Sequence, residues 1–432
     1  MFLCLISSVS GIFAISVILE VSLGSRILGW INTLSMQKYI SRLLPLLLLA
    51  LATVSCSEKS QDDTPGYIVQ VSMGEWDEQF YPTEDIIARI DEVGSIIPLE
   101  KVLVGWVTDP EPYRQIGEYL HSKGIQMLLY LPVFAETEGA FENIPAVDIW
   151  GEVPSKYIIP GGGGFKFNCP TVQSNIDNLI NFYEEHLADV DFDGVFLDRI
   201  RTQSFVCGIN GVLNCGCDNC TALYEAEGVD LAEVRKAYEE KGDKFFSVTS
   251  YEPKTGFTFE DPAAEAFFKA KGKIVSGSVA KVCDYFHSKG MIVGLDLFAP
   301  VLAQFVGQDY SILAEHCDFI KPMLYRMTWA PAGIGFDYDL LRQSAPGAEG
   351  YPELALDVDF LRGQLSAMED LPCQKYPGIE IIYDEKIAPT TPEYIIESLN
   401  TVLEFGYEGA VVSWNIMQVP NDHIQCLNEV GK

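Results

Sequence analysis

The chain has 432 residues, of which 48% are hydrophobic and 12% aromatic, so it can bury a large core, and intrinsic disorder is excluded over most of its length. The formal net charge is −32 and there is no long run of lysine and arginine. This argues against nucleic acid as a partner, because phosphate binding requires positive charge. A neutral or cationic partner, or simple solubility, fits the acidity.

The chain begins with residues 1–55, which we interpret as a signal or membrane-targeting segment outside the fold. Lys38 and Arg42 precede an apolar run over 43–52, which is the layout of a secretory signal. An earlier apolar stretch leaves two alternatives. We favour an initiator at Met36 over an anchor with two membrane spans.

Cys56 follows this apolar run and is the expected site of lipidation. The segment 53–56 is similar to a bacterial lipobox, although Thr53 replaces the usual Leu or Val. Polar residues then predict a tether over 56–65. We therefore expect an exported lipoprotein that its N-terminal lipid holds at the membrane, at the periplasmic face or the cell surface.

Over residues 66–432, short β-branched or aromatic runs alternate with longer amphipathic segments, which predicts βα units around a parallel sheet. Most of these runs are apolar on both faces, as buried parallel strands are. Eight units without a nucleotide-binding loop favour a closed (β/α)8 TIM barrel, an α/β fold, over an open doubly wound sheet. The expected strands are Tyr67–Met73, Val102–Thr108, Gln126–Pro132, Gly194–Asp198, Ile292–Phe298, Phe319–Tyr325, Gly378–Tyr383 and Gly409–Trp414.

Two of the connections between these elements are long. Residues 135–170 follow the third expected strand and residues 200–259 follow the fourth, and the second connection holds a cysteine-rich insertion over 201–258. Long loops after barrel strands usually build the rim of an active site. We therefore expect the functional site at the C-terminal ends of the strands.

The fourth expected strand ends in a carboxylate. Strand alternation puts Phe196 and Asp198 on one face of the strand, so Asp198 points to the barrel mouth, where TIM-barrel enzymes carry their catalytic groups. An ion pair with Arg199 or Arg201 is the purely structural alternative.

Two more acids occupy comparable positions: Asp296 in the fifth expected strand and Glu380 in the seventh. Glycoside hydrolysis requires two carboxylates, one that protonates the leaving group and one that acts as nucleophile or base. We predict Asp198 and Glu380 as this pair, with Asp296 as an orienting group or substitute. Alternatively, Asp296 and Glu380 are buried acids paired with Lys321 or Arg326.

Tryptophans gather at the ends of the expected strands, including Trp329, and Trp150 falls in the long connection after the third. Flat aromatic side chains at a barrel mouth can stack on sugar rings, whereas barrel cores prefer Val, Ile and Leu. The predicted contacts with a carbohydrate ligand are Trp76, Trp106, Asp109, Arg199, Lys321, Tyr325, Arg326, Trp414 and Asn415.

Three short phrases resemble strands of the bacterial glycoside-hydrolase-like TIM barrels, namely residues 192–198, 320–325 and 410–415. The resemblance implies an acid role for Asp198 and sugar contacts by Tyr325 and Trp414. The fourth strand lacks the Asn-Glu pair of the best-known barrel glycosidases, and the seventh has no Glu at its tip. The resemblance therefore does not identify the nucleophile.

Four cysteines follow the fourth expected strand within fourteen residues: Cys207, Cys215, Cys217 and Cys220. Their spacing suits one tetrahedral Zn²⁺, and four thiolates would close the site, so this zinc would be structural. Two disulfides are the alternative, because exported proteins fold in oxidising compartments. The short Cys215 to Cys217 separation disfavours a disulfide between those two residues.

The five histidines all fall in helical segments, away from the strand ends. This disfavours a Ser-His-Asp hydrolase and a His-ligated metal hydrolase, which need imidazole beside the reacting group. Lys321 could form a Schiff base only if an apolar pocket lowered its pKa. The leading hypothesis is a glycoside hydrolase that acts on a polysaccharide or oligosaccharide without a catalytic cofactor. The alternative is a non-catalytic, glycan-binding lipoprotein.

Overall fold

The structure is a computed structural model that describes residues 65–432, apart from 74–79, 106, 136–141, 156 and 159–163. Eight parallel strands form a closed barrel, because β9 pairs with β6 on one side and with β10 on the other. The predicted (β/α)8 barrel is thereby confirmed. The barrel strands are β1 (Gly66–Ser72), β2 (Leu99–Gly105), β3 (Gln126–Pro132), β6 (Gly194–Asp198), β9 (Ile292–Phe298), β10 (Phe319–Met323), β12 (Gly378–Glu380) and β15 (Gly409–Asn415).

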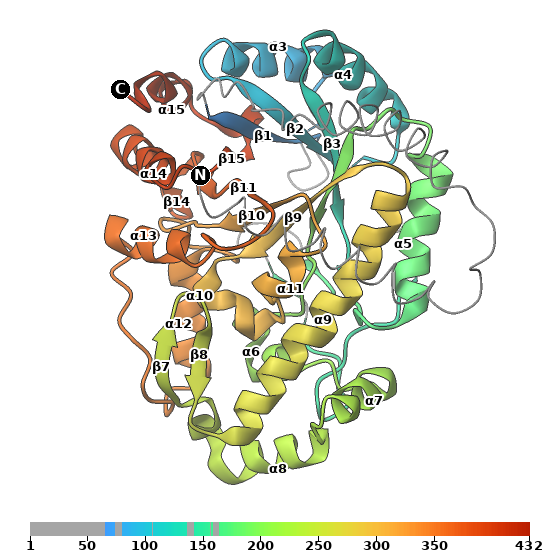
Figure 1. The fold of residues 1–432 in the computed structure, drawn as a ribbon, viewed down its shortest axis with the longest axis vertical. Helices are drawn as coiled ribbons and strands as arrows, with labels where there is room; N and C mark the ends of the chain where they lie inside the picture. Colours follow the sequence, from blue (N-terminus) through green and yellow to red (C-terminus); the bar gives the residue numbers. More distant parts are fainter. Residues whose placement is uncertain (1–64, 74–79, 106, 136–141, 156, 159–163) are drawn as a thin grey trace, which may run out of the picture. The chain divides into compact units, whose positions relative to one another are not determined.

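Helices surround the strands, as Figure 1 shows. The longer ones are α3 (Thr83–Gly94), α4 (Pro110–Ser122), α5 (Gln173–His186), α9 (Pro262–Ser288), α12 (Ile334–Ser344), α13 (Val358–Ser366) and α14 (Pro392–Glu404). Short helices are α10 (Pro300–Ala303), η3 (Gln304–Val306), α11 (Tyr310–Ala314), η4 (Ile416–Gln418), α15 (Asn421–Cys426) and η5 (Leu427–Glu429). In the described part of the chain, no helix is both long and apolar enough to cross a bilayer.

Several helices begin with a side-chain N-cap that is followed by a proline. Asp109 and Asp261 cap α4 and α9 by accepting hydrogen bonds from backbone N–H groups, and a proline follows each cap. Thr391 caps α14 in the same way, again before a proline. The caps satisfy N–H groups that have no partner inside the helix, and proline suits the first helical position. Asp109, predicted to bind substrate, is used here as a helix cap.

A large insertion separates β6 from α9. It contains η1 (Phe205–Cys207), α6 (Gly208–Val212), α7 (Asp218–Ala226), α8 (Leu231–Lys241), η2 (Gly242–Phe246) and the hairpin of β7 (Val248–Glu252) with β8 (Gly256–Phe259). In Figure 1, α8 lies at the lower edge with the hairpin above it to the left and α7 above it to the right, at the end opposite α3 and α4. The remaining short strands are β4 (Tyr157–Ile158), β5 (Gly164–Phe165), β11 (Gln374–Lys375), β13 (Tyr383–Asp384) and β14 (Ala388–Pro389).

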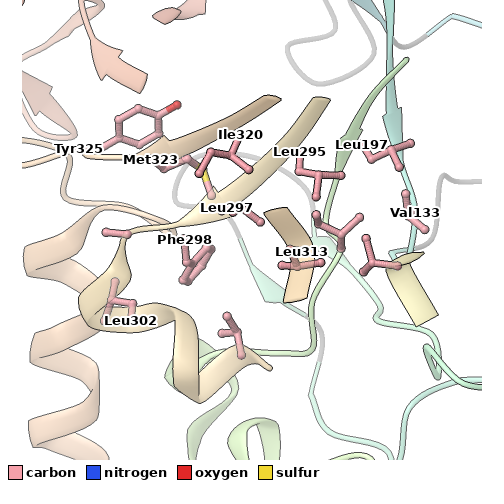
Figure 2. Packing of buried hydrophobic residues seen from close by; sticks show 14 of the residues in the cluster. Val133, Leu197, Leu295, Leu297, Phe298, Leu302, Leu313, Ile320, Met323 and Tyr325 are labelled. Carbon is pink, nitrogen blue, oxygen red and sulfur yellow. The ribbon is translucent and has the colours of Figure 1, made fainter. Parts of the chain in front are cut away.

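The strands divide the core into two parts. Phe196 packs inside the barrel with aromatic and aliphatic side chains from other strands. Leu197, its neighbour in the chain, packs in the layer between strands and helices, where Figure 2 shows it with Leu295 and Leu297. Gly294 makes room inside the barrel, since a Cβ there would lie 2.1 Å from the Phe319 ring. The period-two alternation used to orient Asp198 is therefore observed.

Candidate active site

Five polar side chains meet at the C-terminal half of the barrel and form a group that we call the mouth cluster. Asp198 is the last residue of β6, and the Tyr130 hydroxyl on neighbouring β3 donates a hydrogen bond to its Oδ2 over 3.0 Å. The same hydroxyl lies 3.5 Å from Asp296 Oδ2 on β9. One tyrosine therefore bridges two carboxylates. The mouth cluster comprises Gln70, Tyr130, Asp198, Asp296 and Lys321.

Asp296 and Lys321 form a buried ion pair across β9 and β10. Lys321 Nζ lies 3.1 Å from Asp296 Oδ2 and donates a hydrogen bond of 3.0 Å to Gln70 Oε1. Ser413 donates to the same Gln70 oxygen over 2.9 Å. Asp296 Oδ1 is buried and, among the described residues, has no hydrogen-bond partner. An unsatisfied buried oxygen is costly and is commonest at functional sites.

Burial raises the pKa of Asp296 to about 7; Lys321 opposes this rise, and the neighbouring Asp198 carboxylate adds to it. For Lys321, burial lowers the pKa, but Asp296 and Tyr325 together outweigh burial and the pKa lies above its usual value. Lys321 is therefore held as the ammonium ion. A protonated amine is not a nucleophile, which weighs against Schiff-base chemistry.

Asp198 is the accessible carboxylate of the mouth cluster, with 16% of its side chain exposed against 2% for Asp296. Its Oδ1 accepts a hydrogen bond from the Arg199 backbone N–H, and Arg199 Nε lies 3.9 Å from Oδ2. Arg199 has a φ of 52°, in the left-handed region that non-glycine residues rarely adopt. The chain thus turns sharply directly after Asp198, at the end of β6. Arg199 itself is buried beside Asp198.

Glu380 belongs to a different environment. Its carboxylate is fully buried, and Oε1 accepts a hydrogen bond of 2.7 Å from the Met327 backbone N–H. Burial raises its pKa to about 7, while the Met327 amide, Tyr394 and Arg326 lower it. Among the described residues, no hydrogen bond or ion pair joins Glu380 to Asp198 or Asp296. Glu380 therefore has hydrogen-bond partners of its own, and its pairing with Asp198 in catalysis stays a prediction.

Arg326 belongs to this environment. Its Nη2 donates to Ser398 Oγ over 2.8 Å and its Nη1 donates to the Leu356 carbonyl over 3.1 Å. Its guanidinium also lies 4.8 Å from the centre of the Tyr394 ring on α14. Arg326 is 5% exposed and its guanidinium is held by Ser398 and Leu356, so the predicted sugar contact stays a prediction.

Two aromatic residues lie together beside the mouth cluster. The ring centres of Tyr325 and Trp414 are 6.1 Å apart, and Lys321 Nζ is 5.3 Å from the Tyr325 ring. Burial raises the pKa of the Tyr325 hydroxyl to about 12. Asn415, next to Trp414, donates to the Ser72 carbonyl and accepts from the Met417 N–H. Its side chain therefore ties β15 to β1.

The other tryptophans are distributed differently. Trp329 is 50% exposed and packs edge-on against Phe336. Trp150 packs on Tyr238 and donates to Glu239 of α8, so it joins the two long connections. Trp76 and Trp106 lie outside the described residues, as does Cys56.

The predicted metal ligands require one correction. Cys215, Cys217 and Cys220 do gather, but the fourth sulfur beside them belongs to Cys169. Cys207 instead donates to the Ser155 carbonyl and packs with Ala135 and Phe167. The reason is topological: η1 carries Cys207 away from the others, whereas the connection after β3 brings Cys169 to them.

The sequence analysis also missed Tyr130 and Gln70. Both occupy inward-facing strand positions near the C-terminal end, where a polar side chain in an apolar run is a usable signal. Cys169 had no such signal, because its proximity to the other cysteines arises between two loops.

A cavity of about 400 Å³ borders Gln308, which donates to the Asp296 carbonyl over 3.4 Å. It lies between the β7–β8 turn, α9 and the residues after β9, with Phe268, Gln304 and Tyr310 among its lining. None of its lining residues belongs to the mouth cluster.

No protein-family model matches the chain, and no curated protein is significantly similar to it in sequence. The structure is similar to the glycoside hydrolase domain of PgaB (BpsB) from Bordetella bronchiseptica, with a TM-score of 0.50, 16% identity and coverage of 83% of this chain and 94% of that one. It is also similar to α-L-fucosidase isoenzyme 2 from Paenibacillus thiaminolyticus, with a TM-score of 0.46, 11% identity and coverage of 84% and 48%. The likeness to the PgaB domain shows a shared fold, and a fold alone does not fix an activity.

Proposed function

We propose that the protein is a glycoside hydrolase acting on a polysaccharide or oligosaccharide, with Asp198 as the carboxylate that meets the scissile bond. The observation that carries the proposal is an accessible Asp198 at the end of a barrel strand, held by Tyr130 and Arg199 and placed beside a buried Asp–Lys pair. Barrel enzymes place reacting groups at this end of the strands.

Each member of the mouth cluster has a role in this proposal. Asp198 acts as nucleophile or as the base that activates water, which are the two uses of an ionised carboxylate in glycoside hydrolysis. Tyr130 fixes the orientation of Asp198, and the Asp296–Lys321 pair fixes Tyr130 and Gln70. The partly exposed Trp414 offers the aromatic face on which a sugar ring would stack, and the buried Tyr325 packs against it.

The proton donor to the leaving group is the second carboxylate. Burial raises the pKa of Asp296 and of Glu380 to about 7, which suits a general acid. Aryl glycosides with a strongly acidic phenol as leaving group do not need protonation. The variant that lacks the acid should therefore regain activity on such a substrate, and Asp296→Asn and Glu380→Gln compared on activated and unactivated substrates identify which residue it is.

The test of the main proposal is the release of reducing ends from a panel of polysaccharides by the purified full chain. The wild type should release them from at least one polysaccharide, and Asp198→Asn should lose the activity. Glu385→Gln is the matched control, because it neutralises an exposed carboxylate in the segment after β12 and should leave the activity unchanged. Wild-type turnover in Asp198→Asn would contradict the assignment.

A second candidate function is glycan binding without turnover. The paired Tyr325 and Trp414 rings would serve a binder as well as an enzyme. A binder shows affinity for a polysaccharide by calorimetry and releases no reducing ends from it, in the wild type as in Asp198→Asn.

We further propose that the chain is exported and anchored through lipid on Cys56, on the strength of the apolar run and the lipobox-like segment that precede it. Phase separation in detergent tests this. The wild type should enter the detergent phase, and Cys56→Ala should remain in the aqueous phase.

A further inference from the structure

Four cysteine sulfurs from two separate connections meet in the protein interior. The Sγ atoms of Cys169, Cys215, Cys217 and Cys220 all lie within 4.8 Å of one another. Cys169 comes from the connection between β3 and α5, and the other three come from the insertion between β6 and α9. We infer that these four thiolates bind one Zn²⁺, which joins the two connections.

The sulfur separations match a metal site. Cys169 Sγ lies 3.5 Å from both Cys217 Sγ and Cys220 Sγ. Sulfurs at the usual Zn–S distance of 2.3 Å from a tetrahedral zinc are separated by about 3.8 Å. Disulfide sulfurs are about 2.05 Å apart, so no pair here is bonded. Four protein ligands leave no open position, which makes the inferred zinc structural.

The surroundings support a charged tetrathiolate. A zinc with four thiolates carries two negative charges, which need compensation in a buried site. Lys271 on α9 is completely buried. Burial lowers the pKa of its amine to about 7, and negative charge on Cys215 and Cys220 raises it, so charged thiolates would favour the ammonium ion. The amine donates to the carbonyls of Val212 and Phe305.

Neutral donors and acceptors surround two of the sulfurs. The Thr171 hydroxyl lies 3.1 Å from Cys220 Sγ and 3.3 Å from Cys169 Sγ. Asn219 donates to the Thr171 hydroxyl oxygen over 2.8 Å, which leaves the hydroxyl hydrogen to face a sulfur. Hydrogen bonds of this kind orient metal ligands and stabilise thiolate charge.

The inferred zinc would hold the rim of the mouth in place. Backbone hydrogen bonds of 2.8 and 2.9 Å already join the same two connections, from Gly216 to Val147 and from Ile149 to Leu213. Phe167, two residues before Cys169, lies under the guanidinium of Arg201, which also lies over Phe298 at the end of β9. A contact path thus leads from the cysteines to the mouth. The zinc inference does not depend on the proposed activity.

The experiment is metal analysis of the purified full chain together with two matched variants. We expect one zinc per chain in the wild type and in Cys207→Ser, and loss of zinc in Cys169→Ser. This outcome separates the structural ligand set from the one predicted from sequence spacing. Retention of zinc in Cys169→Ser with loss in Cys207→Ser would overturn the assignment.

A second measurement avoids any variant that fails to fold. Co²⁺ exchanged into the wild-type protein should give the intense thiolate-to-cobalt charge-transfer absorption of a tetrahedral four-sulfur site. Wild-type protein that holds no zinc and gives no such band with Co²⁺ would overturn the inference. In that case, mass spectrometry of the unreduced protein tells whether the cysteines form disulfides or remain as free thiols.

Discussion

Two lysine–carboxylate pairs lie inside opposite ends of the same barrel, and they differ in how completely they are satisfied. At the N-terminal end of the strands, Lys101 pairs with Glu100, and Tyr376 donates to Glu100 over 2.7 Å. Lys101 also lies 4.9 Å from the centre of the Tyr376 ring. We call Glu100, Lys101 and Tyr376 the floor cluster. Glu100 is 40% exposed and so keeps contact with water.

The mouth cluster has the same ingredients in a less balanced arrangement. Asp296 is 2% exposed, has one buried oxygen without a described partner, and shares Tyr130 with a second acid. The negative charge of one carboxylate raises the pKa of the other, and such perturbed pairs are commonest at functional sites. The floor cluster is open to water through Glu100, whereas the Asp296 carboxylate of the mouth cluster is almost completely buried.

The largest expected effect on stability is that of Lys321→Met. Removing one partner of a buried ion pair leaves an uncompensated charge, which costs about 3 to 5 kcal/mol of unfolding free energy. The cost should be larger at pH 8 than at pH 5, because the pKa of Asp296 is already raised to about 7 and a proton can replace the lost cation at low pH. Urea unfolding at both pH values measures this, and equal losses at the two would refute the explanation.

Glu380→Gln tests the effect of burial on a carboxylate apart from the effect of an ion pair, because Glu380 is buried and forms no ion pair with a lysine of the described residues. Its pKa rises from 4.5 to about 7 on folding, so the folded state binds the proton more tightly, and this stabilisation is lost as pH rises through 7. Gln carries no such dependence. The unfolding free energy of the variant relative to wild type should therefore increase by about 3 kcal/mol between pH 4.5 and pH 8. A difference that stays constant with pH would show that Glu380 is ionised in the folded protein.

The floor cluster explains one limit of the sequence analysis. β3, β6 and β9 begin and end at the predicted residues, because each is mostly apolar and, apart from Asp198 at the end of β6, Asp296 is the one charged residue inside them. β2 instead begins at Leu99, three residues before the prediction, since Glu100 and Lys101 interrupt the hydrophobic pattern. β12 ends at Glu380, where the carboxylate binds the Met327 amide and the chain leaves the sheet.

The site was predictable only in part. Asp198 and Asp296 follow from strand alternation, and the structure brings them to one hydroxyl. Alternation could not predict that Glu380 accepts a hydrogen bond from the Met327 amide, because it does not show which neighbouring loop a carboxylate will contact. Cys169 depends on contacts between two connections, and sequence spacing carries no information about such contacts.

Lys101→Met should have a smaller effect than Lys321→Met. Glu100 can regain water when its partner is lost, so the cost should be about 1 kcal/mol, in the range of exposed pairs and cation–π contacts. Urea unfolding of the two variants side by side tests the comparison. A loss as large as that of Lys321→Met would show that the two ends of the barrel are equally dependent on their ion pairs.

Asp198→Asn should have the smallest effect on stability, about 0.5 kcal/mol, because Asn keeps the shape and can still accept from the Arg199 amide. The direct test of the account is kcat on the hydrolysed polysaccharide for Asp198→Asn and Lys101→Met, measured with their melting temperatures. We expect Asp198→Asn to lose at least about 100-fold in kcat while its melting temperature falls by no more than about 2 °C. Lys101→Met should melt earlier and keep wild-type kcat. Wild-type kcat in Asp198→Asn would contradict the assignment of the mouth cluster as the active site.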